Sequence, residues 1–103
     1  MKIKNLPNFS FDKTLYDYTI IAINRRICKD ITNACIKDIY INDLMPELLK
    51  YSLDPKHLKI REKILTYYNE LGFKVIIKNY KSFLSWDHMK FSSRILYAES
   101  LPR

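Results

Sequence analysis

At 103 residues the chain is long enough for one domain with a modest core, and its 48% hydrophobic and 14% aromatic residues exclude an intrinsically disordered chain. The single glycine excludes glycine-rich phosphate loops and an all-β protein with many tight turns. The net charge of +7 favours nucleic acid, an anionic membrane or an acidic protein as partner, and a basic surface that meets only solvent accounts for it equally well.

The apolar runs and the N-terminus bear on the compartment. No apolar run approaches the ~20 residues that a membrane span requires. The first residues, MKIKNLPNFS, lack the apolar centre of a secretory signal. We therefore expect a cytoplasmic protein of the cell that makes it, with no membrane partner.

The N-terminal third predicts one long helix. Residues 1–9 form an entry segment, either a short edge strand or an arm, because Pro7 lies in a stretch that breaks any regular pattern. From about Asp12 to about Thr32 the apolar residues recur at helical spacing. The consecutive apolar residues 20–23 widen this stripe, so we expect the helix to contact more than one neighbour.

A short strand and a short helix follow. Residues 36–41 (IKDIYI) alternate as a strand does. Residues 44–53 predict a short helix with Asn42 or Asp43 as its N-cap and Pro46 in its first turn. Its expected apolar side consists of Leu44, Leu48, Leu49 and Leu53.

The next helix has the clearest signals at both ends. Asp54 can accept a hydrogen bond from an amide of the first turn, and Pro55 suits the first helical position. Gly72 follows the last apolar residue and can adopt the left-handed conformation that ends many helices. The predicted apolar face consists of Ile60, Ile64, Tyr67, Tyr68 and Leu71.

A β-hairpin is predicted after this helix. Phe73, Val75 and Ile77 alternate with other residues as in a strand, and residues 79–82 can turn the chain towards a return strand that ends at Trp86. A lone hairpin is marginal in water, so one face should pack on the helix stripe. The expected fold class is α+β, with three main helices and a small antiparallel sheet built on a C-terminal β-hairpin.

The last residues form either a short helix or an irregular arm. We expect a single domain with a core from 10–87, and Trp86 inside that core. Residues 88–103 are too apolar to remain exposed, so they pack on this domain or on a partner protein. The predicted protein interface consists of Met89, Phe91, Arg94, Ile95, Leu96 and Tyr97.

Basic residues interleaved with aromatic ones suggest a second kind of surface. Lysine can neutralise phosphates, and a flat ring can stack on a base. The predicted nucleic-acid-binding residues are Lys59, Lys63, Lys74, Lys78, Lys81 and Tyr80. A charged face that protects an edge strand from pairing explains the same lysines without a ligand.

No recognisable catalytic or metal-binding pattern is present. His57 and His88 lack convergent partners, and the acidic residues are dispersed. Cys28 and Cys35 lie about 10 Å apart by helical rise, too far for a disulfide, and are expected as reduced core residues. We therefore predict a non-enzymatic protein with no cofactor and no metal.

The segment ILTYYNELGFKVIIKNYKSFLSW resembles the ending of many small proteins encoded by tailed bacteriophages. In those proteins a helix leads through a leucine-glycine-aromatic step into a strand, and a closing strand ends in Ser-Trp. The upstream residues DIYINDLMPELL look similar as well, so the resemblance covers roughly residues 36–86. It implies a phage or phage-like origin, and either a small virion component or an accessory protein directed at a host target.

Three functions remain open at this point. The first is a non-enzymatic phage-type protein that binds other proteins in an assembly, in the host cytoplasm or incorporated into the virion. The second is a basic nucleic-acid-binding accessory protein. The third is an inhibitor of a host enzyme or defence system. The sequence leaves the partner and the oligomeric state undetermined.

Overall fold

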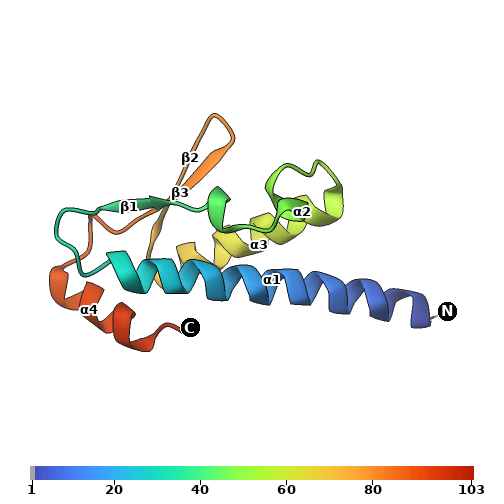
Figure 1. Cartoon of the computed structure of the whole chain (residues 1–103), viewed down its shortest axis with the longest axis horizontal. Helices are drawn as coiled ribbons and strands as arrows, with labels where there is room; N and C mark the ends of the chain where they lie inside the picture. The colour runs from blue at the N-terminus through green and yellow to red at the C-terminus, as the bar shows by residue number, and fades with distance from the viewer. Residues whose placement is uncertain (1) are drawn as a thin grey trace.

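The structure, a computed structural model, describes the backbone of residues 2–103 and the side chains of residues 13–103. Four helices and a small three-stranded antiparallel sheet make up the described chain, which confirms the predicted α+β class. Figure 1 shows α1 running along the longest axis, with the sheet and α3 on one side of it and α4 beneath its C-terminal end.

α1 (Lys2–Asp30) begins about ten residues earlier than the pattern predicted, so the entry segment expected at residues 1–9 is wrong for residues 2–9. Pro7 lies near the helix start, where its missing N–H removes a single backbone hydrogen bond. The helix also ends earlier than Thr32, and Asp30 accepts a hydrogen bond from Arg26 Nε at 2.8 Å. The buried stripe of α1 consists of Ile20, Ile23 and Ile27, with Ile31 just beyond it.

The short helix predicted for residues 44–53 is divided into two pieces. A 3-10 turn, η1 (Asn42–Leu44), is followed by the single-turn α2 (Glu47–Lys50), whose N-cap is Pro46. The predicted cap by Asn42 or Asp43 is therefore wrong, because the Asn42 side chain bonds to the hairpin instead. The predicted apolar side is only partly correct, since Leu49 is buried while Leu48 and Leu53 are exposed.

α3 (Pro55–Leu71) confirms the predicted signals at both of its ends. Asp54 Oδ1 accepts a hydrogen bond from Lys56 N at 2.9 Å, and Gly72 ends the helix with a φ of +112°. A Cβ at this glycine would also lie 3.0 Å from the Tyr97 hydroxyl, so its conformation and its lack of a side chain are both needed. Ile60, Ile64 and Tyr68 form the buried part of the predicted face.

The sheet has β3 (Lys81–Ser85) in the middle, β1 (Asp38–Tyr40) on one side and β2 (Lys74–Lys78) on the other. Both pairings are antiparallel, with Val75 and Ile39 opposite Leu84 on its two sides. These three side chains mark the inner face, which packs on the core. The outer face carries a half-buried row made of Tyr40, Phe83 and Ile76, and the first two rings lie 5.4 Å apart.

The last segment forms a helix, α4 (Phe91–Ser100), and it belongs to the core rather than extending from it. Leu101 is 6% exposed, and the Tyr97 ring lies 5.0 Å from that of Phe73. Tyr97 also donates a hydrogen bond to the Leu71 carbonyl at the end of α3. Residues 88–103 therefore form a short helix and pack on their own domain, which are two of the alternatives expected from the sequence, and they extend the core beyond residue 87.

A buried chain of hydrogen bonds joins three distant segments. The Tyr68 hydroxyl of α3 donates to Asn24 Oδ1 of α1 at 2.7 Å, and Asn24 Nδ2 donates to the Pro102 carbonyl at 2.8 Å. Trp86 is fully buried, as predicted, and its indole Nε1 donates to the Ile36 carbonyl at 2.9 Å. These bonds satisfy polar groups that would otherwise be costly to bury.

Candidate functional site

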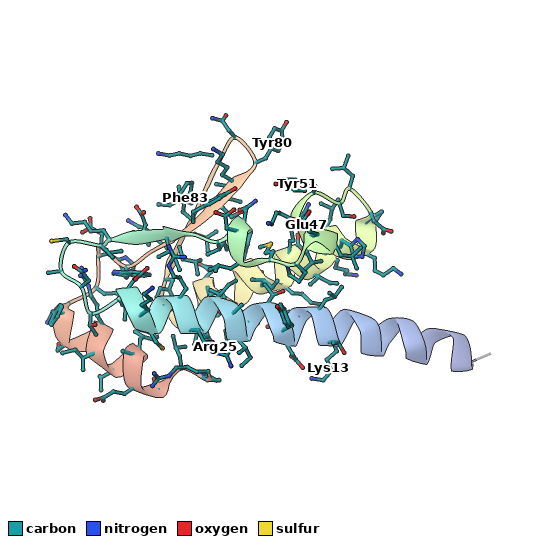
Figure 2. All side chains as sticks on the ribbon, viewed as in Figure 1. Lys13, Arg25, Glu47, Tyr51, Tyr80 and Phe83 are labelled. Carbon is teal, nitrogen blue, oxygen red and sulfur yellow. The ribbon has the colours of Figure 1, made fainter. Side chains whose placement is uncertain are left out.

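Several exposed apolar side chains lie close together between the hairpin tip and the loop that joins α2 to α3. A cleft of about 630 Å³ lies there, and we call it the tip cleft. In Figure 2, Tyr80 at the hairpin tip and Tyr51 beside α2 stand on its two sides. Its apolar lining includes Tyr51, Leu53, Leu58, Leu65, Ile77 and Tyr80.

Four apolar residues on the two walls of the cleft are largely exposed. Tyr51 is 76% exposed, Leu53 83%, Ile77 62% and Tyr80 95%. They come from two separate segments of the chain, the α2–α3 loop and the hairpin, and apolar residues that converge in this way are typical of an interaction surface. Single exposed apolar residues are common, so the convergence and not the exposure carries the argument.

The wall formed by the α2–α3 loop is held in place by polar contacts. His57 is buried, and its Nδ1 lies 2.7 Å from Ser52 Oγ, which also accepts a hydrogen bond from Asp54 N at 3.1 Å. Arg61 donates a hydrogen bond to the Leu49 carbonyl at the end of α2. A fixed loop keeps Tyr51 and its neighbours exposed, because they cannot easily fold back onto the core.

The opposite wall is a tight hairpin in a strained conformation. Asn79 and Tyr80 form its two-residue turn with φ of +49° and +66°, values that suit Asn and Gly but not tyrosine. Asn42 holds this turn by donating to the Tyr80 carbonyl at 3.3 Å and accepting from Ser82 N at 2.8 Å. A strained, almost fully exposed tyrosine is a feature that often marks functional sites.

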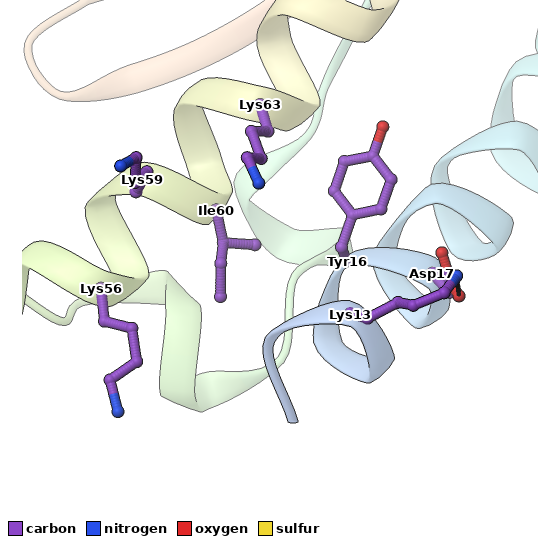
Figure 3. Close-up of a pocket in the computed structure, with 7 residues that line it drawn as sticks. All are labelled: Lys13, Tyr16, Asp17, Lys56, Lys59, Ile60 and Lys63. Atoms are coloured by element: carbon purple, nitrogen blue, oxygen red, sulfur yellow. Dashed lines mark hydrogen bonds and ion pairs between the residues drawn. The ribbon is translucent and has the colours of Figure 1, made fainter. Parts of the chain in front are cut away.

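A second hollow, of about 360 Å³, lies between α1 and α3, and we call it the basic pocket. Figure 3 shows Lys56, Lys59 and Lys63 on α3, with Lys63 and Ile60 on the side of that helix next to Tyr16 of α1. Lys13 also lines the basic pocket, but it forms an ion pair with Asp17 at 3.0 Å. Burial raises the pKa of Tyr16, and Tyr67 adds to that effect.

The predicted nucleic-acid residues do not form one surface. Lys59 and Lys63 meet in the basic pocket, together with Lys56 and Lys13, which the prediction had left out. Tyr80 and Lys81 line the tip cleft instead. Lys74 and Lys78 share the outer face of β2 with Ile76.

The predicted protein interface is divided between the core and the surface. Met89 and Tyr97 pack against the core, and Arg94 is buried with no hydrogen-bond partner for its Nε among the described residues. The remaining residues, Phe91, Ile95 and Leu96, are exposed on α4.

Sequence reasoning missed Tyr51, Leu53, Leu58 and Ile77 as site residues. One signal was available for Leu58, which lies off the face that carries Ile60 and Ile64.

Groups that support other chemistry are sparse in the described part of the chain. No cluster of three or more His, Cys, Asp or Glu side chains that could hold a metal is found in it. Cys28 is half-buried, and burial raises the pKa of its thiol. Cys35 is exposed, so the expectation that it lies in the core is wrong, because α1 ends before it. No helix among the described residues is both long and apolar enough to cross a membrane.

Comparison of the chain with protein-family models, with curated proteins and with solved structures gives no match.

Proposed function

We propose that this chain is a non-enzymatic protein that binds another protein through the tip cleft. The observation that carries the proposal is the convergence of Tyr51, Leu53, Ile77 and Tyr80 on one cleft whose walls are fixed by hydrogen bonds. The hydrogen bonds hold the loop and the hairpin turn in place, so less conformational entropy of these two segments is lost when a partner binds.

The biological context of that interaction is proposed only from the sequence resemblance to small phage proteins. The leucine-glycine-aromatic step and the Ser-Trp ending suggest a phage-type protein. We propose that the chain is a minor component of a virion assembly. An inhibitor of a host enzyme would use the same cleft. The identity of the bound protein separates these two settings, because a virion protein indicates assembly and a host enzyme indicates inhibition.

Site-specific photocrosslinking tests the proposal in the cell that naturally produces the chain. A photoreactive phenylalanine analogue replaces Tyr51 in the tip cleft, and in a matched control it replaces Tyr18, an exposed tyrosine on α1 outside the cleft. We expect one discrete covalent product at position 51 and none at position 18, with the partner identified by mass spectrometry. No product at 51, or the same products at both positions, would overturn the proposal.

The basic pocket favours nucleic acid as a second candidate function. Lys56, Lys59 and Lys63 have no ion-pair partner among the described side chains, and Tyr16 offers a ring beside them. Affinity for single-stranded DNA that falls about a thousandfold between ~50 and ~200 mM salt would indicate several phosphate contacts.

Paired charge reversals give this second candidate its control. Lys59→Glu with Lys63→Glu should abolish DNA binding if the basic pocket is the site. Lys74→Glu with Lys78→Glu changes the net charge equally at the outer face of β2, and should leave most of the affinity intact. Equal losses in the two variants would point to a diffuse charge effect without a site.

A further inference from the structure

β2 is an edge strand, and its free side presents backbone groups in a defined pattern. The strand order β1-β3-β2 leaves β2 with one hydrogen-bonded neighbour in the described structure. Ile41 N donates to the Ser82 carbonyl and Trp86 N to the Lys37 carbonyl, so alternate residues of β3 point towards β1. The residues between them, including Phe83, must therefore point their backbone groups towards β2.

This alternation determines which residues of β2 are unpaired. Ile76 lies opposite Phe83 and exchanges hydrogen bonds with it, as Lys74 and Lys78 do with Ser85 and Lys81. The backbone N–H and C=O groups of Val75 and Ile77 consequently point away from the sheet. Such a row is a template for an added strand.

The side chains along this edge show what kind of strand fits. On the outer face, Lys74 and Lys78 flank the half-buried Ile76, and neither lysine has an ion-pair partner among the described residues. Lys78 also lies directly opposite Lys81, and like charges in that arrangement repel. The edge is therefore basic, apolar, basic in order, with an internal repulsion that an anionic neighbour would relieve.

From the charge pattern and the geometry of this edge, we propose that an extended segment of the partner protein pairs with β2 as an added strand. The segment has the sequence acidic-x-apolar-x-acidic. The acidic residues lie beside Lys74 and Lys78, and the apolar residue extends the row of Tyr40, Phe83 and Ile76. The x residues lie beside Val75 and Ile77, of which Ile77 lines the tip cleft. This inference rests on the proposed protein-binding function and names the partner's chemistry.

A second copy of this chain fits the edge poorly. Antiparallel pairing of two β2 strands about Ile76 would place Lys74 of each copy against Lys78 of the other. Four lysines would then meet across one interface, and such pairs oppose association. Acidic residues at those positions reverse the sign of the interaction.

The test uses the full chain and a short synthetic peptide that carries Glu-Val-Phe-Val-Glu. Hydrogen exchange of single amides is followed by NMR with and without the peptide. We expect slower exchange at Val75 and Ile77, whose amides gain partners, and little change at Ile76, which is already paired. A peptide with lysine in place of glutamate, and one with the same composition in the order Glu-Glu-Phe-Val-Val, should both fail to protect these amides.

Two variants separate backbone pairing from charge. Ile77→Pro removes an outward N–H without touching the β2–β3 ladder, while Ile77→Ala keeps that N–H and removes the side chain. We expect Ile77→Pro to weaken peptide binding roughly tenfold or more and Ile77→Ala to weaken it less. Lys78→Glu should weaken it by a similar factor to Ile77→Pro.

Several outcomes would overturn the inference. These are unchanged exchange at Val75 and Ile77, equal protection by the lysine peptide, or protection that grows with protein concentration in the absence of peptide, which would show that a second copy occupies the edge. If crosslinking at Tyr51 still captures a partner after one of these outcomes, strand addition fails while protein binding through the tip cleft stands. If the peptide binds and crosslinking fails, the edge is used without the cleft.

Discussion

The C-terminal helix and the hairpin tip have similar apolar content and opposite structural roles. α4 and Leu101 dock on α1 and on the end of α3, where Tyr97 contacts Phe73. The hairpin tip projects from the body, and its apolar residues Ile77 and Tyr80 remain exposed. Apolar content alone therefore predicts that a segment packs against something. Whether it packs on its own domain depends on the contacts that the rest of the fold offers it.

Removing the C-terminal helix tests the comparison most severely. Deletion of residues 91–103 would take away Leu101, the Tyr97 ring and the carbonyl that Asn24 bonds. Since one buried side chain alone is worth about 2–5 kcal/mol, we expect the truncated chain to lose cooperative unfolding in urea. A truncated form that unfolds cooperatively with nearly the original midpoint would return this segment to the role of a separate docking arm.

A matched pair of leucines near the end of α4 localises that effect. Leu101→Ala should lower the free energy of unfolding by about 2–5 kcal/mol, because its side chain is buried in the core. Leu96→Ala, at a position 64% exposed, should change it by less than about 0.5 kcal/mol. Urea denaturation of both variants gives the two values, and equal losses would mean that α4 packs differently from the arrangement described.

The buried Tyr68 hydroxyl offers a test that depends on pH. Tyr68→Phe leaves Asn24 Oδ1 and the Ile20 carbonyl without this donor, so we expect a loss of about 1–3 kcal/mol at neutral pH. Burial raises the pKa of Tyr68, and the unfolded chain therefore releases this proton more readily than the folded one. Its contribution is fully present below about pH 10 and is lost as the pH rises above that value.

The free energy of unfolding, measured from pH 8 to 11, tests whether the contribution of Tyr68 falls as the pH rises. The original chain should lose stability more steeply above about pH 10 than Tyr68→Phe does, since the other titrating groups are common to both. Parallel curves for the two proteins would show that the hydroxyl does not bridge α3 and α1.

Local signals in the sequence predicted the parts of the fold that local chemistry determines. Asp54, Pro55 and Gly72 define both ends of α3, and the alternation around Val75 predicts the hairpin. The docking of α4 depends on contacts such as that of Asn24 with Pro102, which join residues far apart in the chain. No local pattern reports such a contact.

The candidate site was harder to predict for the same reason. The tip cleft forms where the α2–α3 loop faces the hairpin tip, so its residues are not neighbours in the sequence. Lys59 and Lys63 were recognised as basic, but their pocket also needs Tyr16 from α1. Spacing along one element identifies a face, whereas a cleft requires the relative placement of several elements.

Substitution of Tyr80 tests whether the backbone strain at the hairpin tip lowers the stability of the free protein. Tyr80→Gly should raise the free energy of unfolding by about 0.5–1 kcal/mol, because glycine adopts the φ of +66° without strain. The tyrosine is 95% exposed, so little packing is lost with it. Asn79→Gly should change stability less, since asparagine tolerates this conformation. A destabilised Tyr80→Gly protein would mean that the ring contributes to the free fold.

Lys78→Glu is expected to change stability only slightly, and it tests the edge strand and its proposed partner together. Lys78→Glu replaces a like-charge pair with Lys81 by an opposite-charge pair, and should raise the free energy of unfolding by about 0.2–1 kcal/mol. The same substitution places a negative charge where the acidic segment is expected to bind, so peptide affinity should fall while stability rises. Lys29→Glu, on the exposed side of α1, has the same effect on net charge and should leave peptide affinity unchanged. If the lysines only protect the edge from pairing, the original chain would not bind the peptide at all. Lys78→Glu would then raise stability without any effect on peptide binding.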